Sequence, residues 1–163
     1  MKIFIRNIFL LFTVVVLFIQ CEDDLTKSPP YIPIDILKAA PDSLRIEDKV
    51  IKLSTSMGVN MMPSTDPNPD RNYMAITYIA TTDSSDFPSA TDAEYIYIIY
   101  NDEVSGSYLK YDGYSQDTFR IVKNASVTPK WGYDIYTDVV VIITYHNKKY
   151  LLKANQQYIG AAW

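Results

Sequence analysis

The chain has one cysteine, Cys21, and one histidine, His146. A single cysteine cannot close an internal disulfide, and it excludes zinc sites built from several cysteines. A general base needs an oriented partner and a cleft, and the sequence places neither beside His146, which stands between two predicted strands. These absences predict a protein without catalytic activity whose stability comes from burying apolar and aromatic residues.

Basic residues are also scarce relative to acidic ones. Fifteen Lys and Arg against nineteen Asp and Glu give a formal net charge of −4, which disfavours nucleic acid and anionic membrane surfaces as partners. After the first twenty residues no apolar run is long enough to predict a membrane-spanning helix. The composition therefore predicts an acidic domain that does not bind nucleic acid.

The N-terminus is built like an export signal. Lys2 and Arg6 form a short basic start, residues 8–19 are apolar, and residues 22–24 (Glu-Asp-Asp) are acidic. The segment 17–21 (Leu-Phe-Ile-Gln-Cys) resembles the bacterial lipoprotein signal, in which the cysteine becomes the lipidated N-terminus. Lipoproteins of the Bacteroidetes are similar in carrying an acidic run after that cysteine. The resemblance implies lipidation at Cys21, attachment to the outer membrane and display on the cell surface. An uncleaved membrane anchor and an ordinary secretory signal are the alternatives.

Composition divides the chain into three parts. Residues 1–20 are the predicted signal peptide, and residues 21–42, with four prolines after the lipidated cysteine, are predicted to be a tether. Residues 35–40 can form one helical turn, which Pro41 would end. Residues 43–163 are predicted to form one domain.

Short β-branched and aromatic runs in residues 43–163 predict an all-β domain. The clearest candidate strands are residues 73–80, 94–100, 139–145 and 149–153, and weaker ones are residues 44–47, 50–55 and 59–62. Long polar connections favour a two-sheet antiparallel β-sandwich, and immunoglobulin-like lipoprotein domains look similar in size and strand texture. A lipocalin-like β-barrel is the alternative.

One acidic loop is a candidate metal site. Asp66, Asn68 and Asp70 alternate and can direct oxygens at one hard cation such as calcium. An EF-hand loop counted from Asp66 fails, because Arg71 stands where glycine is needed and Thr77 where a bidentate Glu belongs. A plain solvated turn is the alternative reading, and calcium is the one candidate cofactor.

Tyrosine and tryptophan near predicted turns are the candidate ligand-binding residues. Their rings can stack on sugars or contact a protein partner, and loops on a rigid β-domain often bind. The alternative is that they fill cross-strand pairs at the rim of the core. The candidates are Trp131, Tyr133, Tyr136, Tyr111 and Tyr114.

These observations favour a lipid-anchored cell-surface binding or accessory module for carbohydrate or a protein partner, by analogy with accessory lipoproteins of polysaccharide uptake. A structural envelope spacer is the second hypothesis. A lipocalin-like carrier of a small apolar ligand is the third, and it requires a hollow interior.

Overall fold

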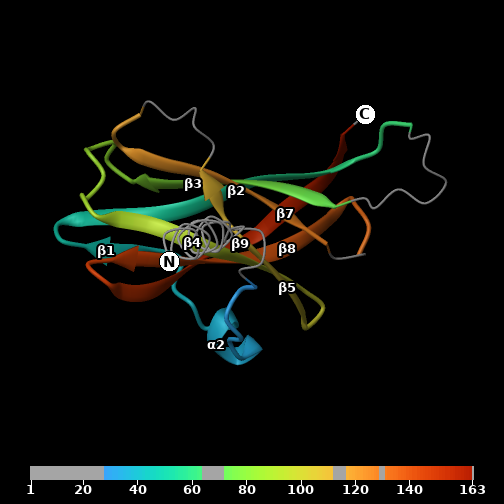
Figure 1. The fold of residues 1–163 in the computed structure, drawn as a ribbon, viewed down its shortest axis with the longest axis horizontal. Coiled ribbons are helices and arrows are strands. Elements are labelled where there is room, and N and C mark those ends of the chain that lie inside the picture. The colour runs from blue at the N-terminus through green and yellow to red at the C-terminus, as the bar shows by residue number, and fades with distance from the viewer. Residues whose placement is uncertain (1–27, 64–71, 112–116, 129–130, 163) are drawn as a thin grey trace, which may run out of the picture.

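The computed structural model describes residues 28–63, 72–111, 117–128 and 131–162. Within these ranges the chain is all-β apart from one short helix (Figure 1). The elements are α2 (Ile34–Lys38), β1 (Leu44–Ile46), β2 (Lys49–Asn60), β3 (Tyr73–Thr81), β4 (Thr91–Tyr100), β5 (Glu103–Tyr108), β6 (Lys110–Tyr111), β7 (Arg120–Val127), β8 (Ile135–Tyr145) and β9 (Lys148–Ala162). No helix among the described residues is long and apolar enough to cross a bilayer.

All strands of the described residues belong to one sheet, in the order β5-β4-β8-β9-β2-β3-β7-β6, with β1 paired to β2. Every pairing is antiparallel except that of β2 with β9, in which Met57 lies opposite Ile159 and Asn60 opposite Ala162. The first long strand and the last are therefore neighbours, although about a hundred residues separate them in the chain.

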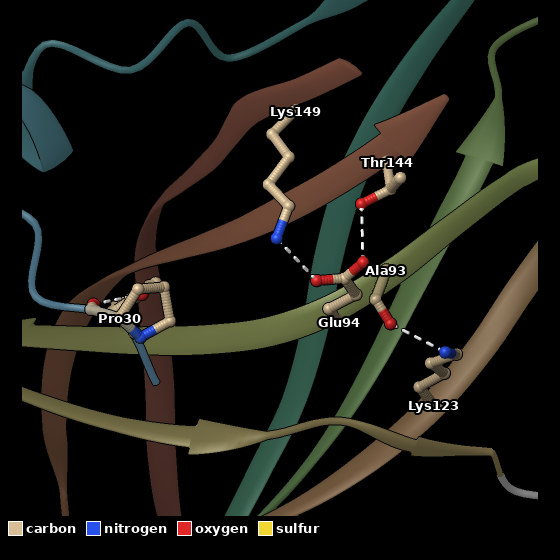
Figure 2. Close-up of polar contacts among 7 residues, drawn as sticks. Pro30, Ala93, Glu94, Lys123, Thr144 and Lys149 are labelled. Carbon is tan, nitrogen blue, oxygen red and sulfur yellow. Dashed lines mark hydrogen bonds and ion pairs between the residues drawn. The ribbon is translucent and has the colours of Figure 1, made fainter. Parts of the chain in front are cut away.

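The sheet almost closes on itself at the chain segment 103–111. The first part of this segment, β5, pairs with β4, and the last part, β6, pairs with β7. Between them, the backbone N–H of Leu109 donates to the carbonyl oxygen of Glu94 at 2.8 Å. A buried lysine adds a second link, because Lys123 Nζ on β7 donates to the carbonyl oxygen of Ala93 on β4 at 2.7 Å (Figure 2).

This single curved sheet does not confirm the two-sheet, immunoglobulin-like sandwich that the sequence favoured. The barrel alternative is compatible with it. The physical reason is the continuity of hydrogen bonding, since β2 and β9 join the two halves that a sandwich would keep in separate layers. Long connections between strands, which suggested crossovers, do not distinguish the two architectures.

The interior of the barrel is filled with apolar side chains. Alternate residues of the long strands point inward and are almost fully buried, as the two-residue period of a strand requires. They include Ile51, Ile79, Ile98, Val141, Leu152 and Ile159. The two weak candidate strands, residues 50–55 and 59–62, are parts of one continuous strand, β2, which ends at Asn60 and whose inward positions join this core.

A second, smaller core lies outside the barrel under α2. Leu37 of α2 is fully buried against outward-facing residues of β4 and β8, including Ile99 and Val140. In Figure 1, α2 lies at the bottom of the view, and β2 and β3 lie on the opposite, upper side of the molecule. This cover explains why β4 is apolar on both faces.

The described part of the predicted tether packs on the barrel. The hydroxyl of Tyr97 donates to the carbonyl oxygen of Pro30 at 2.8 Å, and the backbone N–H of Lys153 on β9 donates to that of Pro41 at 2.8 Å. Pro29 lies over Gly106, where a Cβ atom would come within 2.8 Å of its ring. Residues 28–42 are therefore part of the folded unit, because their apolar side chains find a sheet face to cover.

Candidate binding face

A groove of about 480 Å³ lies on the outer surface where β2, β3 and the end of β9 meet. We call it the outer groove; it is lined by residues that include Gly58, Asn60, Met62, Met74, Ile76 and Gly160. Gly58 is the centre of one cross-sheet row, because it pairs with Met74 on one side and with Gly160 on the other.

The floor of the outer groove is the backbone at Gly58 and Gly160, where no side chain fills the space. A Cβ atom at Gly58 would approach the carbonyl oxygen of Gly160 at 3.5 Å, an ordinary contact, so glycine is not required there by crowding. The walls are Met62 and Met74, each 58% exposed. Asn60 holds the turn into Met62, since its Oδ1 accepts the backbone N–H of Met62 at 3.0 Å. Flexible thioether side chains around an open floor suit an adaptable apolar contact.

A pair of exposed tyrosines borders the outer groove. Tyr136 of β8 and Tyr158 of β9 are cross-strand partners, with ring centroids 5.4 Å apart and ring planes at 48°. The Tyr158 hydroxyl donates to Asp134 Oδ1 at 2.6 Å, and this hydrogen bond raises the pKa of Tyr158. The ring edge of Tyr158 would lie 3.1 Å from a Cβ atom at Gly160, so the pair adjoins the floor of the outer groove.

The structure separates the predicted aromatic residues. Tyr136 belongs to the pair beside the outer groove, and Tyr133, 41% exposed, lies in the turn before β8. Tyr111 is exposed on β6. Tyr114 lies outside the described residues.

Trp131 has a different environment from that expected of a free loop residue. It packs partly buried against the barrel core, with its ring 6.5 Å from Tyr73 and 5.7 Å from Tyr100 between centroids. Its indole N–H donates to Glu103 Oε2. The buried Tyr73 beside it donates to the carbonyl oxygen of Gly132, and burial raises the pKa of Tyr73. This arrangement fixes Trp131 against the barrel.

Sequence reasoning missed Tyr158, Met74 and the two floor glycines. The signal was alternation: Tyr158 and Gly160 share the outward face of β9, and Met74 and Ile76 share that of β3. Simple alternation along the sequence could not predict which side chains of β9 point outward. The reason is a register shift between Thr137 and Val139, which disturbs the pairing of β8 with β9.

The predicted calcium ligands, Asp66, Asn68 and Asp70, lie outside the described residues. Among the residues that are described, no group of three or more His, Cys, Asp and Glu side chains is placed to hold a metal ion. His146 is exposed in the turn between β8 and β9, with its ring 4.2 Å from that of Tyr145.

The charged side chains near the start of β4 are engaged in pairs. Glu94 accepts from Lys149 Nζ and from the Thr144 hydroxyl, each at 3.0 Å, and chiefly the contact with Lys149 lowers the pKa of Glu94 (Figure 2). Lys123 Nζ, buried inside the barrel, also lies 2.6 Å from Asp92 Oδ1. These pairs link β4 to β8, β9 and β7, which is a structural role.

The outer groove and its tyrosine pair thus form the candidate site, and comparison with protein-family models, curated proteins and solved structures finds no match for this chain.

Proposed function

We propose that the chain is a lipid-anchored binding module on the surface of a Gram-negative cell, without catalytic activity, that binds carbohydrate or a protein partner through the outer groove. The signal-like segment ending at Cys21 and the acidic residues after it support the anchor and the surface display. The observation that carries the binding role is the pairing of an open apolar groove with two exposed tyrosines whose rings contact each other.

The shape of the outer groove favours carbohydrate. Its volume of about 480 Å³ lies in the range of small-ligand pockets, but it is open to water along one side. A sugar ring can lay its C–H face on glycine, methionine and tyrosine while its hydroxyl groups stay hydrated. The residues that line the outer groove carry no ionisable side chain, which suits an uncharged sugar.

The alternative role as a carrier of a small apolar ligand is disfavoured by the packed interior of the barrel. A lipocalin-like carrier needs a hollow barrel, whereas Ile79, Ile98 and Val141 are fully buried members of one continuous apolar cluster that fills the space between the strands. A spacer without a ligand is the remaining alternative, and it predicts no saturable binding at all.

The anchor is tested by mass spectrometry of the protein from its native membrane. We expect an N-terminal peptide that begins at Cys21 and carries acyl chains, and we expect Cys21→Ser to release the protein from the membrane fraction. An unmodified Cys21 in the native protein would reject the anchor.

The binding role is tested on the mature chain with a glycan array and, in parallel, with a cross-linking pull-down from intact cells. Tyr136→Ala and Tyr158→Ala are expected to weaken binding at least about tenfold, which is the loss of one good aromatic contact. Tyr111→Ala is the matched control, because Tyr111 is exposed on β6, which β7 separates from the groove strand β3. Equal loss in all three variants, or no saturable ligand in either screen, would contradict the proposal.

A further inference from the structure

Three exposed apolar side chains gather on the side of the barrel that α2 covers. Tyr31, just before α2, is 92% exposed; Ile36 on α2 is 53% exposed; and Val104 on β5 is 39% exposed. Val104 lies beside Ile99 in the sheet, and Ile99 is one of the residues that α2 buries, so Val104 shares this surface. We call the surface marked by these three residues the α2 face.

The α2 face is held rigidly on the barrel. Leu37 is fully buried beneath it, and the Tyr97 hydroxyl donates to the carbonyl oxygen of Pro30 beside Tyr31. Lys38 at the end of α2 forms an ion pair with Asp102 in the turn between β4 and β5. The exposed apolar side chains therefore keep one orientation relative to the strands.

The chain between the anchor and the α2 face is short. Seven peptide units separate Cys21 from residue 28, and even fully extended they span at most about 25 Å. A compact domain of this size is about 35 Å across. A lipid on Cys21 would thus hold the barrel within less than its own diameter of the membrane, with the N-terminal side of the barrel nearest to it.

We propose that the α2 face rests on the membrane that holds the anchor, with Tyr31, Ile36 and Val104 in the interfacial layer of the bilayer. This inference rests on the proposed lipidation of Cys21. Tyrosine suits that layer because its ring is apolar and its hydroxyl remains hydrated, and Ile36 adds apolar area beside it.

The contact is apolar rather than electrostatic. The charged groups of α2 are Asp35 and Lys38, and Lys38 is paired with Asp102. Lys153 of β9 donates from Nζ to the carbonyl oxygen of Lys38, and among the described residues of the α2 face no cluster of free basic side chains is left to attract anionic lipid headgroups. Docking is therefore expected on zwitterionic phosphatidylcholine, which has no net charge, and it should persist at about 0.5 M salt, where surface charges are screened within a few ångströms.

The single cysteine makes a direct test possible. The mature chain, beginning at Cys21, is coupled through that thiol to a maleimide lipid in phosphatidylcholine nanodiscs that also contain a gadolinium-chelating lipid. We expect the paramagnetic relaxation of backbone amides in nuclear magnetic resonance spectra to be strongest at Tyr31, Ile36 and Val104. It should be weakest at Met74, in the outer groove on the other side of the barrel.

Two variants separate docking from simple tethering. The double variant Tyr31→Asp/Ile36→Asp is expected to lower relaxation at the α2 face at least twofold, because charged side chains leave the interfacial layer. Met74→Asp is the matched control for the membrane contact, since Met74 is 58% exposed and apolar but lies in the outer groove, and it should leave the relaxation at the α2 face unchanged. Dispersed amide spectra of each variant in solution show that the fold is intact.

Three outcomes would overturn the inference. Equal relaxation over all faces would mean that the barrel tumbles freely on its tether. A relaxation pattern that depends on the number of chains per nanodisc would mean that the α2 face binds a second copy, and a pattern abolished by salt would mean electrostatic attraction. Because the lipid is attached chemically, these outcomes are independent of whether the cell lipidates Cys21, which the native mass spectrum decides.

Discussion

The absence of a side chain at Gly58 gives the outer groove its depth, and this leads to the first prediction. Gly58→Val should fill the groove and abolish ligand binding while leaving the fold intact, because a Cβ atom there meets only an ordinary 3.5 Å contact. Valine also favours a strand, so the free energy of unfolding should stay equal or rise by about 0.5–1 kcal/mol. Binding isotherms and urea denaturation of the same sample check both expectations.

Gly160→Ala is the matched comparison for Gly58→Val. Its Cβ atom would lie 3.1 Å from the Tyr158 ring, which must move to make room. We expect this variant to weaken binding by shifting the tyrosine pair, without filling the floor. If Gly58→Val retains full affinity, the outer groove is not the ligand site.

The second prediction concerns Tyr97, whose hydroxyl reaches Pro30. Burial, and to a smaller extent the neighbouring Tyr95, raises the pKa of Tyr97 from its ordinary value of 10.0 to about 12. The folded state therefore keeps a proton that the unfolded chain releases between about pH 10 and 12. The stability contribution of this proton is complete below pH 10 and is lost as the pH rises towards 12.

Urea denaturation of the natural protein and of Tyr97→Phe, at about pH 9 and about pH 11.5, measures this contribution. At the lower pH the variant should be less stable by about 1 kcal/mol, the net value of one hydrogen bond. Its stability should then fall less between the two pH values. Part of the alkaline loss should remain, since burial also raises the pKa of Tyr73. Parallel losses in both proteins would contradict the assignment to Tyr97.

At the residue scale, the sequence identified tyrosines as candidate ligand contacts but could not sort them. Tyr136 and Trp131 stand in similar turn-rich sequence, yet one borders the outer groove and the other packs against the core. What separates them is the aromatic residue that each contacts, the cross-strand partner Tyr158 for Tyr136 and the buried Tyr73 for Trp131. Such partners lie 20 or more residues away, and local composition carries no signal for them.

At the element scale, α2 is a five-residue helix that is stabilised by what it covers. It has no side-chain N-cap hydrogen bond, and a helix this short is marginal on its own. Leu37→Ala should lower the free energy of unfolding by about 2–4 kcal/mol, because it leaves a cavity over Ile99 and Val140. Ile36→Ala, one residue away and half exposed, should change it by about 0.5 kcal/mol or less.

Thermal and urea unfolding of the Leu37→Ala and Ile36→Ala variants compare the two faces of the same turn. Equal small effects would mean that α2 is not docked on the barrel in solution. In that case the α2 face would lose its fixed orientation.

Single strands were the most predictable elements. The apolar run 139–145 and its hairpin partner after His146 form β8 and β9, with His146 and Asn147 at positive φ in the two-residue turn, the geometry such turns favour. The sequence did not indicate that residues 28–42 pack on the barrel, because prolines mark a chain without internal hydrogen bonds, whether it is free or packed. Packing there depends on Ile99 and Val140, which come much later in the chain.

At the scale of the whole molecule, the near-closure of the sheet into a ring could not be predicted from the sequence. It depends on the parallel contact of β2 with β9 and on the change of partner within residues 103–111, from β4 to β7. Both are pairings between segments that are distant in the chain. Their free-energy cost is the entropy of closing a long loop, and the local residue preferences that a sequence shows do not report it. An all-β domain was predictable from strand texture, and the barrel could be retained only as an alternative.

The ring closure gives the fourth prediction, through Lys123. Its Nζ lies inside the barrel, 2.7 Å from the carbonyl oxygen of Ala93 and 2.6 Å from Asp92. Lys123→Met keeps the length of the side chain but leaves that carbonyl without its charged donor, so the free energy of unfolding should fall by about 1.5–3 kcal/mol. Amide hydrogen exchange should rise first in β4, β6 and β7.

Lys149→Met is the control for Lys123→Met, because Lys149 also pairs with a carboxylate of β4, Glu94, but from an exposed position. An exposed ion pair contributes about 1 kcal/mol or less, and hydrogen exchange between β4 and β7 should not change. Identical behaviour of the two variants would remove Lys123 from the closure of the ring.

The packing of residues 28–42 on the barrel also decides how the molecule bears a mechanical load. A pull on the N-terminal end of the chain, such as the proposed anchor would transmit, acts first on the Pro30–Tyr97 hydrogen bond and on the buried Leu37. These contacts can peel away one after another, whereas the strands of the ring share their load over long rows of hydrogen bonds. The segment would lengthen under tension while the ring, and the outer groove on it, keeps its shape.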